Sequence, residues 1–466
     1  MSSKKILILF IVSFLSISVS AQSTITGYFQ ALTGQKVRLF GFDGFISSTL
    51  DSTVVSDNGI FKLKYSEKNK GMGYLVTRDN KAYFVVLSGE DIQLKGETFD
   101  FPETITILSG KENQLFKQYA TEHLTREQAL DAWIYLQKIY QKDSIFIKQK
   151  ISQQNIASEI MRIKQEDNDF LKSINEKSYM SWYLPIRKLI SSVSAIAQYR
   201  TEEIEATIAA FRKINYTDER LYKSGLLKDV IESHYWLLEN MGQPLDSVYN
   251  AMNISTNYLL SSLSKDEKKF NEITKYVFDL LESHSLFKAS EYLAVKVLTQ
   301  NSCTLNNNLA NKLEMYRAMK TGNTAPDILF TGDVFKNGTV ENTTKYLSEM
   351  KSDYKVVIFG ASWCSKCTEE LGQLLPIYDK WKAKGVEVVF ISLDTVKSTF
   401  KSFSSVFPFI SMCDYKKWNT QAVKDYYVFA TPTLYLLNSK REILLRPNSV
   451  SHLNSWIDWY LVQGNK

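Results

Sequence analysis

The chain has 466 residues, which is too long for a single hydrophobic core, so about three domains are expected. Its 44% hydrophobic and 13% aromatic residues indicate folded globular domains and exclude a disordered, collagen-like or coiled-coil chain. The formal net charge is +6, and because the basic residues are scattered, the charge gives no sign of a nucleic-acid partner. The four cysteines, Cys303, Cys364, Cys367 and Cys413, are too few for a disulfide framework in a chain of this length.

The first 21 residues have the pattern of a secretory signal peptide. Lys4 and Lys5 precede an apolar run over residues 6–12, and Val19-Ser20-Ala21 supplies the small residues that a signal peptidase recognises. No cysteine follows the apolar run, so a lipid anchor of the bacterial lipoprotein type is not expected. No later stretch reaches the roughly 18 apolar residues that a membrane span requires. The mature chain is therefore predicted to be exported, most simply to the periplasm, and to carry no transmembrane segment.

Residues 22–110 show short alternating strands separated by turn signals such as Asp57-Asn58-Gly59 and Ser88-Gly89. This pattern predicts an all-β domain that resembles a small antiparallel sandwich or barrel. No set of residues in it suggests catalysis, so a binding or spacer module is expected. The expected strands are 24–29, 36–40, 52–55, 60–63, 83–87 and 91–94.

Residues 111–320 change to a helical pattern. Ile204, Ile208 and Phe211 recur at helical spacing, and the segment Ser264 to Glu267 has the form of a capping box before another amphipathic helix. We therefore expect a helical bundle or array. The stretch 321–327 breaks this pattern and is the expected linker to a C-terminal domain over residues 321–466.

The C-terminal domain has the pattern of an α/β fold. A hairpin is expected over 328–340 and a short helix over 343–350, followed by buried strands at 354–359 and 385–392. With a helix between them, these two strands form a parallel βαβ unit. Pro432 begins a further strand, and because proline lacks an N–H, it fits an edge position or a cis turn better than the interior of a sheet.

Cys364 and Cys367 stand where the first buried strand gives way to a helix, and we interpret them as a redox-active dithiol. At a helix N terminus, unpaired N–H groups and the positive end of the helix dipole favour the thiolate over the thiol. Cys364 is thus the expected nucleophile. Cys367, one turn later, is placed to attack a mixed disulfide at Cys364 and release the product. Cys303 is interpreted as an unreactive bystander, and Cys413 as a buried small hydrophobic residue at a strand end rather than a third redox thiol.

Trp363-Cys364-x-x-Cys367 and Thr431-Pro432-Thr433, together with the flanking strands, resemble the thioredoxin fold. More narrowly, residues 325–466 resemble the TlpA-like thiol-disulfide oxidoreductases of the bacterial envelope. The opening Ala325-Pro326-Asp327 and the 68 positions between Cys364 and Pro432 match that branch. The resemblance implies a cis Thr431–Pro432 bond facing the dithiol, where the Thr431 backbone pairs with an extended substrate segment.

The resemblance also implies roles for neighbouring side chains and shows three departures. Trp363, Thr431 and Pro432 are the expected substrate-binding residues, and Glu370 is expected to lie near the dithiol and tune its protonation. Ile358 stands where thioredoxin has a buried aspartate, so the proton must move through water or a carboxylate such as Glu370. Gly372 stands where a helix-kinking proline is usual. The pair Ser365-Lys366 leaves the redox potential open, although the Lys366 charge should lower the thiol pKa.

Other functions of a Cys-x-x-Cys pair require residues at defined positions. A zinc site would need a second cysteine pair or a Cys-His pair, and a c-type haem site would need histidine where Thr368 stands. A thiol peroxidase has threonine at the place of Ala361. An envelope binding or scaffold protein with a non-essential thioredoxin-like domain is the non-enzymatic alternative. The favoured prediction is an exported reductase or isomerase of protein disulfides, with no cofactor or metal, protein disulfide or thiol substrates, and an unidentified envelope electron donor.

Overall fold

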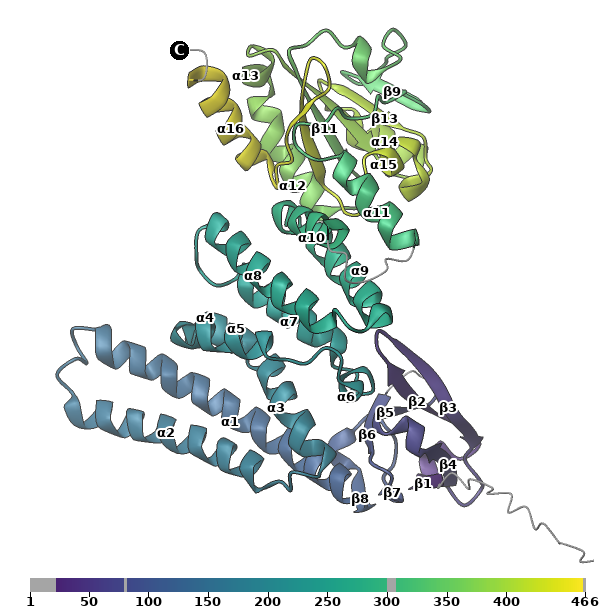
Figure 1. The fold of residues 1–466 in the computed structure, drawn as a ribbon, viewed down its shortest axis with the longest axis vertical. Helices are drawn as coiled ribbons and strands as arrows, with labels where there is room; N and C mark the ends of the chain where they lie inside the picture. The colour runs from purple at the N-terminus through teal and green to yellow at the C-terminus, as the bar shows by residue number, and fades with distance from the viewer. Residues whose placement is uncertain (1–21, 79–81, 300–306, 464–466) are drawn as a thin grey trace, which may run out of the picture. The chain divides into compact units, whose positions relative to one another are not determined.

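The computed structural model describes residues 22–78, 82–299 and 307–463. The predicted signal peptide, residues 1–21, and Cys303 lie outside the described residues. Three regions follow one another along the chain, a β-rich region, a helical region and an α/β region, which confirms the predicted fold class (Figure 1).

The chain forms two compact units. One unit comprises Met1–Phe211 with Asp218–Leu237, and the other comprises Arg212–Thr217 with Leu238–Lys466. The boundary between them passes through the helical region, so the first half of the helices belongs with the β-rich region and the second half with the α/β region.

The β-rich region contains two four-stranded sheets, in the orders β4-β1-β7-β8 and β3-β2-β5-β6. Alternate side chains of both sheets enter one shared core, which includes the aromatic rings of Phe29, Phe61 and Phe99. The expectation of a purely antiparallel region was wrong in one place, because β1 and β7 pair in parallel. Two strands, β5 and β8, were not predicted. The strands are β1 (Gln22–Tyr28), β2 (Lys36–Asp43), β3 (Ile46–Val54), β4 (Ile60–Ser66), β5 (Gly71–Val76), β6 (Ala82–Leu87), β7 (Ile92–Lys95) and β8 (Thr106–Ser109).

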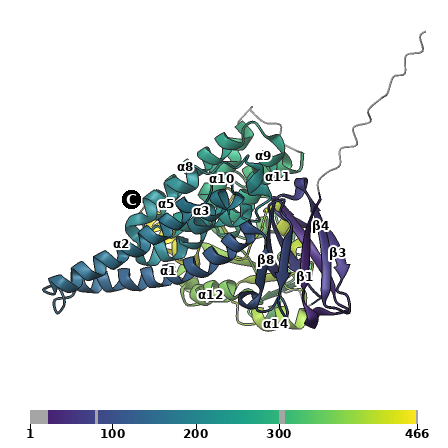
Figure 2. The same cartoon turned by 90° about the horizontal axis from the view of Figure 1, so that it is seen from below.

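Seven helices follow, and the first two form a long antiparallel hairpin that both cartoon views show (Figures 1 and 2). The hairpin is held by a stripe of aliphatic side chains from both helices, including Leu130, Ile134, Ile156 and Ile160. The helices are α1 (Lys111–Lys142), α2 (Lys150–Ser173), α3 (Tyr179–Ser191), α4 (Val193–Tyr199), α5 (Ile204–Arg212), α6 (Glu219–Tyr222) and α7 (Leu227–Glu239).

Four further helices precede the α/β region: α8 (Leu245–Leu263), α9 (Glu267–Ser283), α10 (Phe287–Thr299) and α11 (Asn307–Ala318). The predicted cap of α9 was wrong by two residues. Asp266, not Ser264, is the N-cap, and its carboxylate accepts a hydrogen bond from Lys269 N at 3.1 Å. A carboxylate suits this position because it satisfies a free N–H and faces the positive end of the helix dipole.

The α/β region is built on a seven-stranded sheet of order β10-β9-β13-β12-β11-β14-β15. The pairs β11/β12 and β12/β13 are parallel, so the predicted βαβ unit is confirmed. The short helix predicted over 343–350 was wrong, because only the single 3₁₀ turn Leu347–Glu349 forms there. The strands are β9 (Asp333–Lys336), β10 (Thr339–Val340), β11 (Tyr354–Gly360), β12 (Val386–Ser392), β13 (Ile410–Cys413), β14 (Thr433–Asn438) and β15 (Ile443–Leu445).

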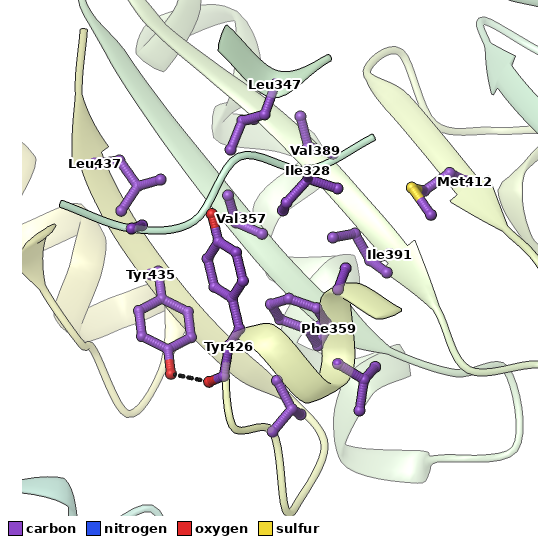
Figure 3. Packing of buried hydrophobic residues seen from close by; sticks show 14 of the residues in the cluster. Ile328, Leu347, Val357, Phe359, Val389, Ile391, Met412, Tyr426, Tyr435 and Leu437 are labelled. Carbon is purple, nitrogen blue, oxygen red and sulfur yellow. Dashed lines mark hydrogen bonds between the residues drawn. The ribbon is translucent and has the colours of Figure 1, made fainter. Parts of the chain in front are cut away.

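Both faces of this sheet are buried, which explains why its central strands are continuously apolar. Val357 and Phe359 of β11 enter one core, which Figure 3 shows around Tyr426 and Tyr435, whereas Ile358 enters the core on the opposite face. The Tyr435 hydroxyl donates to the backbone oxygen of Tyr426 at 2.8 Å. The helices of this region are α12 (Ser365–Leu374), α13 (Tyr378–Lys382), α14 (Lys397–Ser404), α15 (Gln421–Asp425) and α16 (Val450–Gln463).

No helix among the described residues is long and apolar enough to cross a membrane.

Candidate active site

Cys364 occupies the N-cap position of α12, directly after the turn that follows β11. Its Sγ accepts a hydrogen bond from Cys367 N at 3.1 Å, and the two cysteines are joined in a disulfide. In the reduced protein the same N–H and the end of the helix dipole would stabilise a Cys364 thiolate. The local order of apolar strand, turn and helix therefore creates the electrostatic environment that a nucleophilic thiol needs.

The two sulfurs differ in accessibility. Cys364 is partly exposed, whereas Cys367 is only 1% exposed and belongs to the buried side of α12. Gly360 at the end of β11 leaves room for the ring of Phe390, because a Cβ at this position would lie 2.9 Å from that ring, and it would also touch the Cys367 Sγ at 3.4 Å. An incoming protein sulfur thus meets Cys364 first.

The Thr431–Pro432 peptide bond is cis, as the cis-turn alternative and the resemblance both implied. The edge-position alternative was wrong, since the strand that begins at Thr433 pairs with β11 on one side and β15 on the other. The backbone oxygen of Thr431 lies 3.4 Å from the Cys364 Sγ. Both Thr431 and Pro432 are partly exposed, so backbone atoms beside the sulfur remain within reach of a ligand.

Trp363 precedes the nucleophile and is more than half exposed. The ammonium group of Lys417 lies 5.2 Å from the centroid of its ring, in the geometry of a cation–π contact. An exposed indole next to a reactive thiol offers apolar contact area to a substrate.

Lys366 and Glu370 contact each other rather than standing alone. The Lys366 ammonium lies 2.9 Å from the Glu369 carboxylate and 3.2 Å from that of Glu370, and these hydrogen bonds raise its pKa, Glu369 first. The positive charge that was expected to act on the thiol is therefore shared with two carboxylates. Glu370 is buried, and its other oxygen accepts a hydrogen bond from Val450 N, the first residue of α16, at 2.6 Å.

Gly372 lies within α12, which runs to Leu374 without a proline. The change of direction comes just after it, where Leu375–Ile377 forms a 3₁₀ turn that contains Pro376 before α13 begins. The proline signal is thus present in this chain but displaced by four positions from the place where the resemblance implied it.

Asp394, which sequence reasoning missed, supports the turn that carries the nucleophile. Its buried carboxylate accepts hydrogen bonds from the Ser362 hydroxyl at 2.6 Å and from the Ser392 hydroxyl at 2.7 Å, and the Ser362 N–H lies 3.3 Å away. The sequence position of Asp394 could have pointed to it, because this residue comes two positions after the end of a buried strand parallel to β11. Ligand-binding residues of α/β sheets gather at such strand ends. The role of Asp394 here is to fix Ser362, two positions before Cys364.

Cys413 is fully buried at the end of β13, and its Sγ lies 3.2 Å from the backbone oxygen of Asp394. Burial raises the pKa of this thiol to about 11, so it stays protonated at neutral pH. Within the described part of the chain, no three His, Cys, Asp or Glu side chains are placed to hold a metal ion.

The fold and the site together define a thioredoxin-like domain with a Cys-x-x-Cys pair at the N terminus of its first helix. Residues 352–443 match the family described as Thioredoxin-like, and residues 23–116 match a domain of unknown function, DUF4369.

Several proteins similar to this chain are thiol-disulfide oxidoreductases. The thiol-disulfide oxidoreductase ResA of Oceanobacillus iheyensis is 28% identical over 136 residues, which cover 29% of this chain and 68% of ResA. The sporulation thiol-disulfide oxidoreductase A of Bacillus subtilis is 28% identical over 118 residues, covering 23% of this chain and 68% of that protein. A solved thioredoxin-like protein from Bacteroides caccae is 19% identical, with a TM-score of 0.37 over 55% of this chain and 92% of that one. The C-terminal domain is thus of the thiol-disulfide oxidoreductase class, a class of enzymes.

Proposed function

We propose that this chain is an exported enzyme that reduces or isomerises disulfide bonds of other proteins. The observation that carries the proposal is the setting of Cys364, whose partly exposed Sγ lies at the N terminus of α12 and 3.4 Å from the Thr431 backbone oxygen. An extended substrate segment can pair with the backbone at Thr431 while its disulfide approaches Cys364. The export rests on the signal-peptide pattern of residues 1–21.

The reaction begins from the reduced dithiol. The Cys364 thiolate attacks one sulfur of a substrate disulfide, forms a mixed disulfide, and releases the other substrate sulfur as a thiolate that takes up a proton. Cys367 then loses its proton and attacks the Cys364 Sγ. The substrate leaves as a dithiol, and two electrons have passed to it from the enzyme. The resulting Cys364–Cys367 disulfide is the form seen in the structure, and an unidentified envelope electron donor must reduce it before the next turnover.

Three side chains support these steps in the proposal. Trp363 offers an exposed ring beside the nucleophile, and Pro432 keeps an N–H out of the place where substrate backbone docks. Glu370 is a buried carboxylate on the same helix as Cys367, three residues further on, and in the proposal it accepts the proton that Cys367 loses.

The order of attack can be tested by trapping. In Cys367→Ser the second step is lost, so a mixed disulfide with the substrate should accumulate, disappear on reduction, and identify the substrate by mass spectrometry. Cys364→Ser should trap nothing, and Cys413→Ser is the matched control that should behave as the unmodified protein. Trapping that requires Cys367 and not Cys364 would reverse the assignment of the nucleophile.

The alternative function, an envelope binding or scaffold protein without enzymatic activity, predicts a different result. If neither variant traps a protein and the unmodified chain does not reduce insulin disulfides, the enzymatic proposal fails and the binding function remains. The export is tested separately by cell fractionation and by determining the N terminus of the mature protein, which should begin at Gln22. A chain that retains Met1 and stays in the cytoplasm would contradict it.

A further inference from the structure

The turn that joins α1 to α2 is unusually apolar and unusually exposed. Ile145 is 74% exposed, Ile147 43% and Ile151 75%. Single exposed aliphatic residues are common on soluble proteins, but three that lie within seven positions of one turn form a group that needs an explanation. We call this group, with the lysines described below, the hairpin tip.

The turn at the hairpin tip is held by side-chain hydrogen bonds and by a contact between two aromatic rings. The Asp143 carboxylate accepts a hydrogen bond from Ile145 N at 2.8 Å, and the Phe146 ring packs on Tyr140 with 4.8 Å between centroids. The Gln153 side-chain amide donates to the backbone oxygens of Tyr140 and Ile147, both at 2.9 Å. Because the Phe146 ring packs on Tyr140 and the backbone is held by these hydrogen bonds, the three isoleucines stay exposed.

The tip also lies at the far end of the long α1–α2 hairpin. α1 has 32 residues, which corresponds to about 48 Å along the helix axis. Figures 1 and 2 show the turn at the end of the hairpin remote from the strands of the same compact unit. Among the described residues of this unit, no other helix or strand lies beside the tip in either view, so a large flat partner could reach it.

The charge around the isoleucines is predominantly positive. Between Ala132 and Ser158 the sequence contains four lysines and a single acidic residue, Asp143. The lysines are Lys138, Lys142, Lys148 and Lys150. The last three are exposed, and in the described part of the chain none of the four side chains makes an ion pair or hydrogen bond. Their charges are thus free to act on a partner.

We propose that the hairpin tip docks on a membrane surface that contains anionic lipid. Aliphatic side chains that enter the headgroup region, surrounded by lysines that contact lipid phosphates, are the combination that holds peripheral proteins at such a surface. A protein partner fits less well, because protein interfaces are depleted in lysine and enriched in aromatic residues and arginine. The tip would hold the chain at the membrane surface.

The test is co-sedimentation with lipid vesicles. The protein is used without residues 1–21, which leaves every described residue in place, and the vesicles are either phosphatidylcholine alone or phosphatidylcholine mixed with phosphatidylglycerol. We expect binding only to the mixed vesicles. Each lysine near an anionic surface contributes about a fivefold gain in partitioning, so Lys148→Glu with Lys150→Glu should weaken binding by about 25-fold or more. Ile145→Ser with Ile151→Ser should weaken it by at least about tenfold.

Lys36→Glu with Lys68→Glu is the matched control, since it makes the same charge change at exposed lysines of the β-rich region and should leave binding nearly unchanged. All the substituted side chains are exposed, and circular dichroism checks that the variants fold. The proposal is overturned if the unmodified protein ignores the mixed vesicles or if both tip variants bind as it does. It is also overturned if sedimentation equilibrium without lipid reveals a dimer that the isoleucine variant abolishes, because the tip would then be an interface between copies of this chain.

Discussion

Replacing Glu282 by glutamine should strongly destabilise the compact unit that contains the α/β region. Glu282 on α9 is 3% exposed, and its carboxylate lies 3.2 Å from the guanidinium of Arg446, which follows β15. The guanidinium is enclosed by the rings of Phe287, Tyr316 and Tyr435, at 4.2, 4.7 and 5.2 Å from their centroids. Both side chains of the pair are buried, so a charge that loses its partner is poorly screened by solvent.

The magnitude follows from this burial. Removing one member of a buried ion pair costs about 3–5 kcal/mol, because the remaining charge is left uncompensated. The Ser290 hydroxyl also donates a hydrogen bond to the Glu282 carboxylate. Its loss adds little, since the oxygens of Ser290 and Tyr316 lie 2.8 Å apart and stay hydrogen-bonded to each other. The matched control is Asp246→Asn, which breaks the largely exposed pair with Lys288 and should cost about 0–1 kcal/mol.

Hydrogen exchange is the suitable assay, because a chain with more than one compact unit does not unfold in a single two-state step. Amides of α9 and β15 that exchange through opening of this unit should exchange about 100-fold faster in Glu282→Gln, as expected for a loss of about 3 kcal/mol. A double variant with leucine at both Glu282 and Arg446 should recover much of the loss. The reasoning would be refuted if Glu282→Gln changed these amides no more than Asp246→Asn does.

Four further predictions concern the dithiol and its surroundings. Because burial raises the pKa of Cys413 to about 11, its thiol should stay neutral and resist iodoacetamide in the folded, reduced protein at pH 8. Peptide mass spectrometry should detect alkylation of Cys413 only above about pH 10. Rapid labelling at neutral pH would contradict this prediction. Pro432→Ala should slow insulin reduction while leaving reaction with a small disulfide reagent nearly intact, whereas equal losses would indicate a folding defect. Lys366→Glu should raise the pKa of Cys364, measured from the pH profile of alkylation, and an unchanged profile would show that its partners Glu369 and Glu370 already cancel its charge. Glu370→Gln keeps an acceptor for Val450 N but not a proton acceptor, so the mixed disulfide should be resolved about 100-fold more slowly, as expected for loss of a general base, and Glu369→Gln on the same helix should not have this effect.

The sequence by itself determined the parts of this protein that depend on local order. The apolar run, the turn and the helical pattern around Cys364 and Cys367 are continuous in the chain, so the strand, the helix and the nucleophile's place at the helix end could be predicted from neighbouring residues. The cis alternative at Pro432 was available for the same reason, because proline restricts its own peptide bond. Buried strands and helical segments were found wherever the period of apolar residues was clear.

Only the tertiary structure decided which distant groups meet. Glu370 accepts a hydrogen bond from the backbone 80 positions later, and Arg446 contacts a carboxylate 164 positions earlier. Asp394, which follows the neighbouring strand β12, holds Ser362. The parallel pairing of β1 with β7 and the antiparallel place of β9 beside β13 are of the same kind. Such contacts depend on how the layers of the fold pack against one another. The sequence position of a charged side chain such as Lys366 suggests a role, but its partner depends on which carboxylate the fold brings within reach.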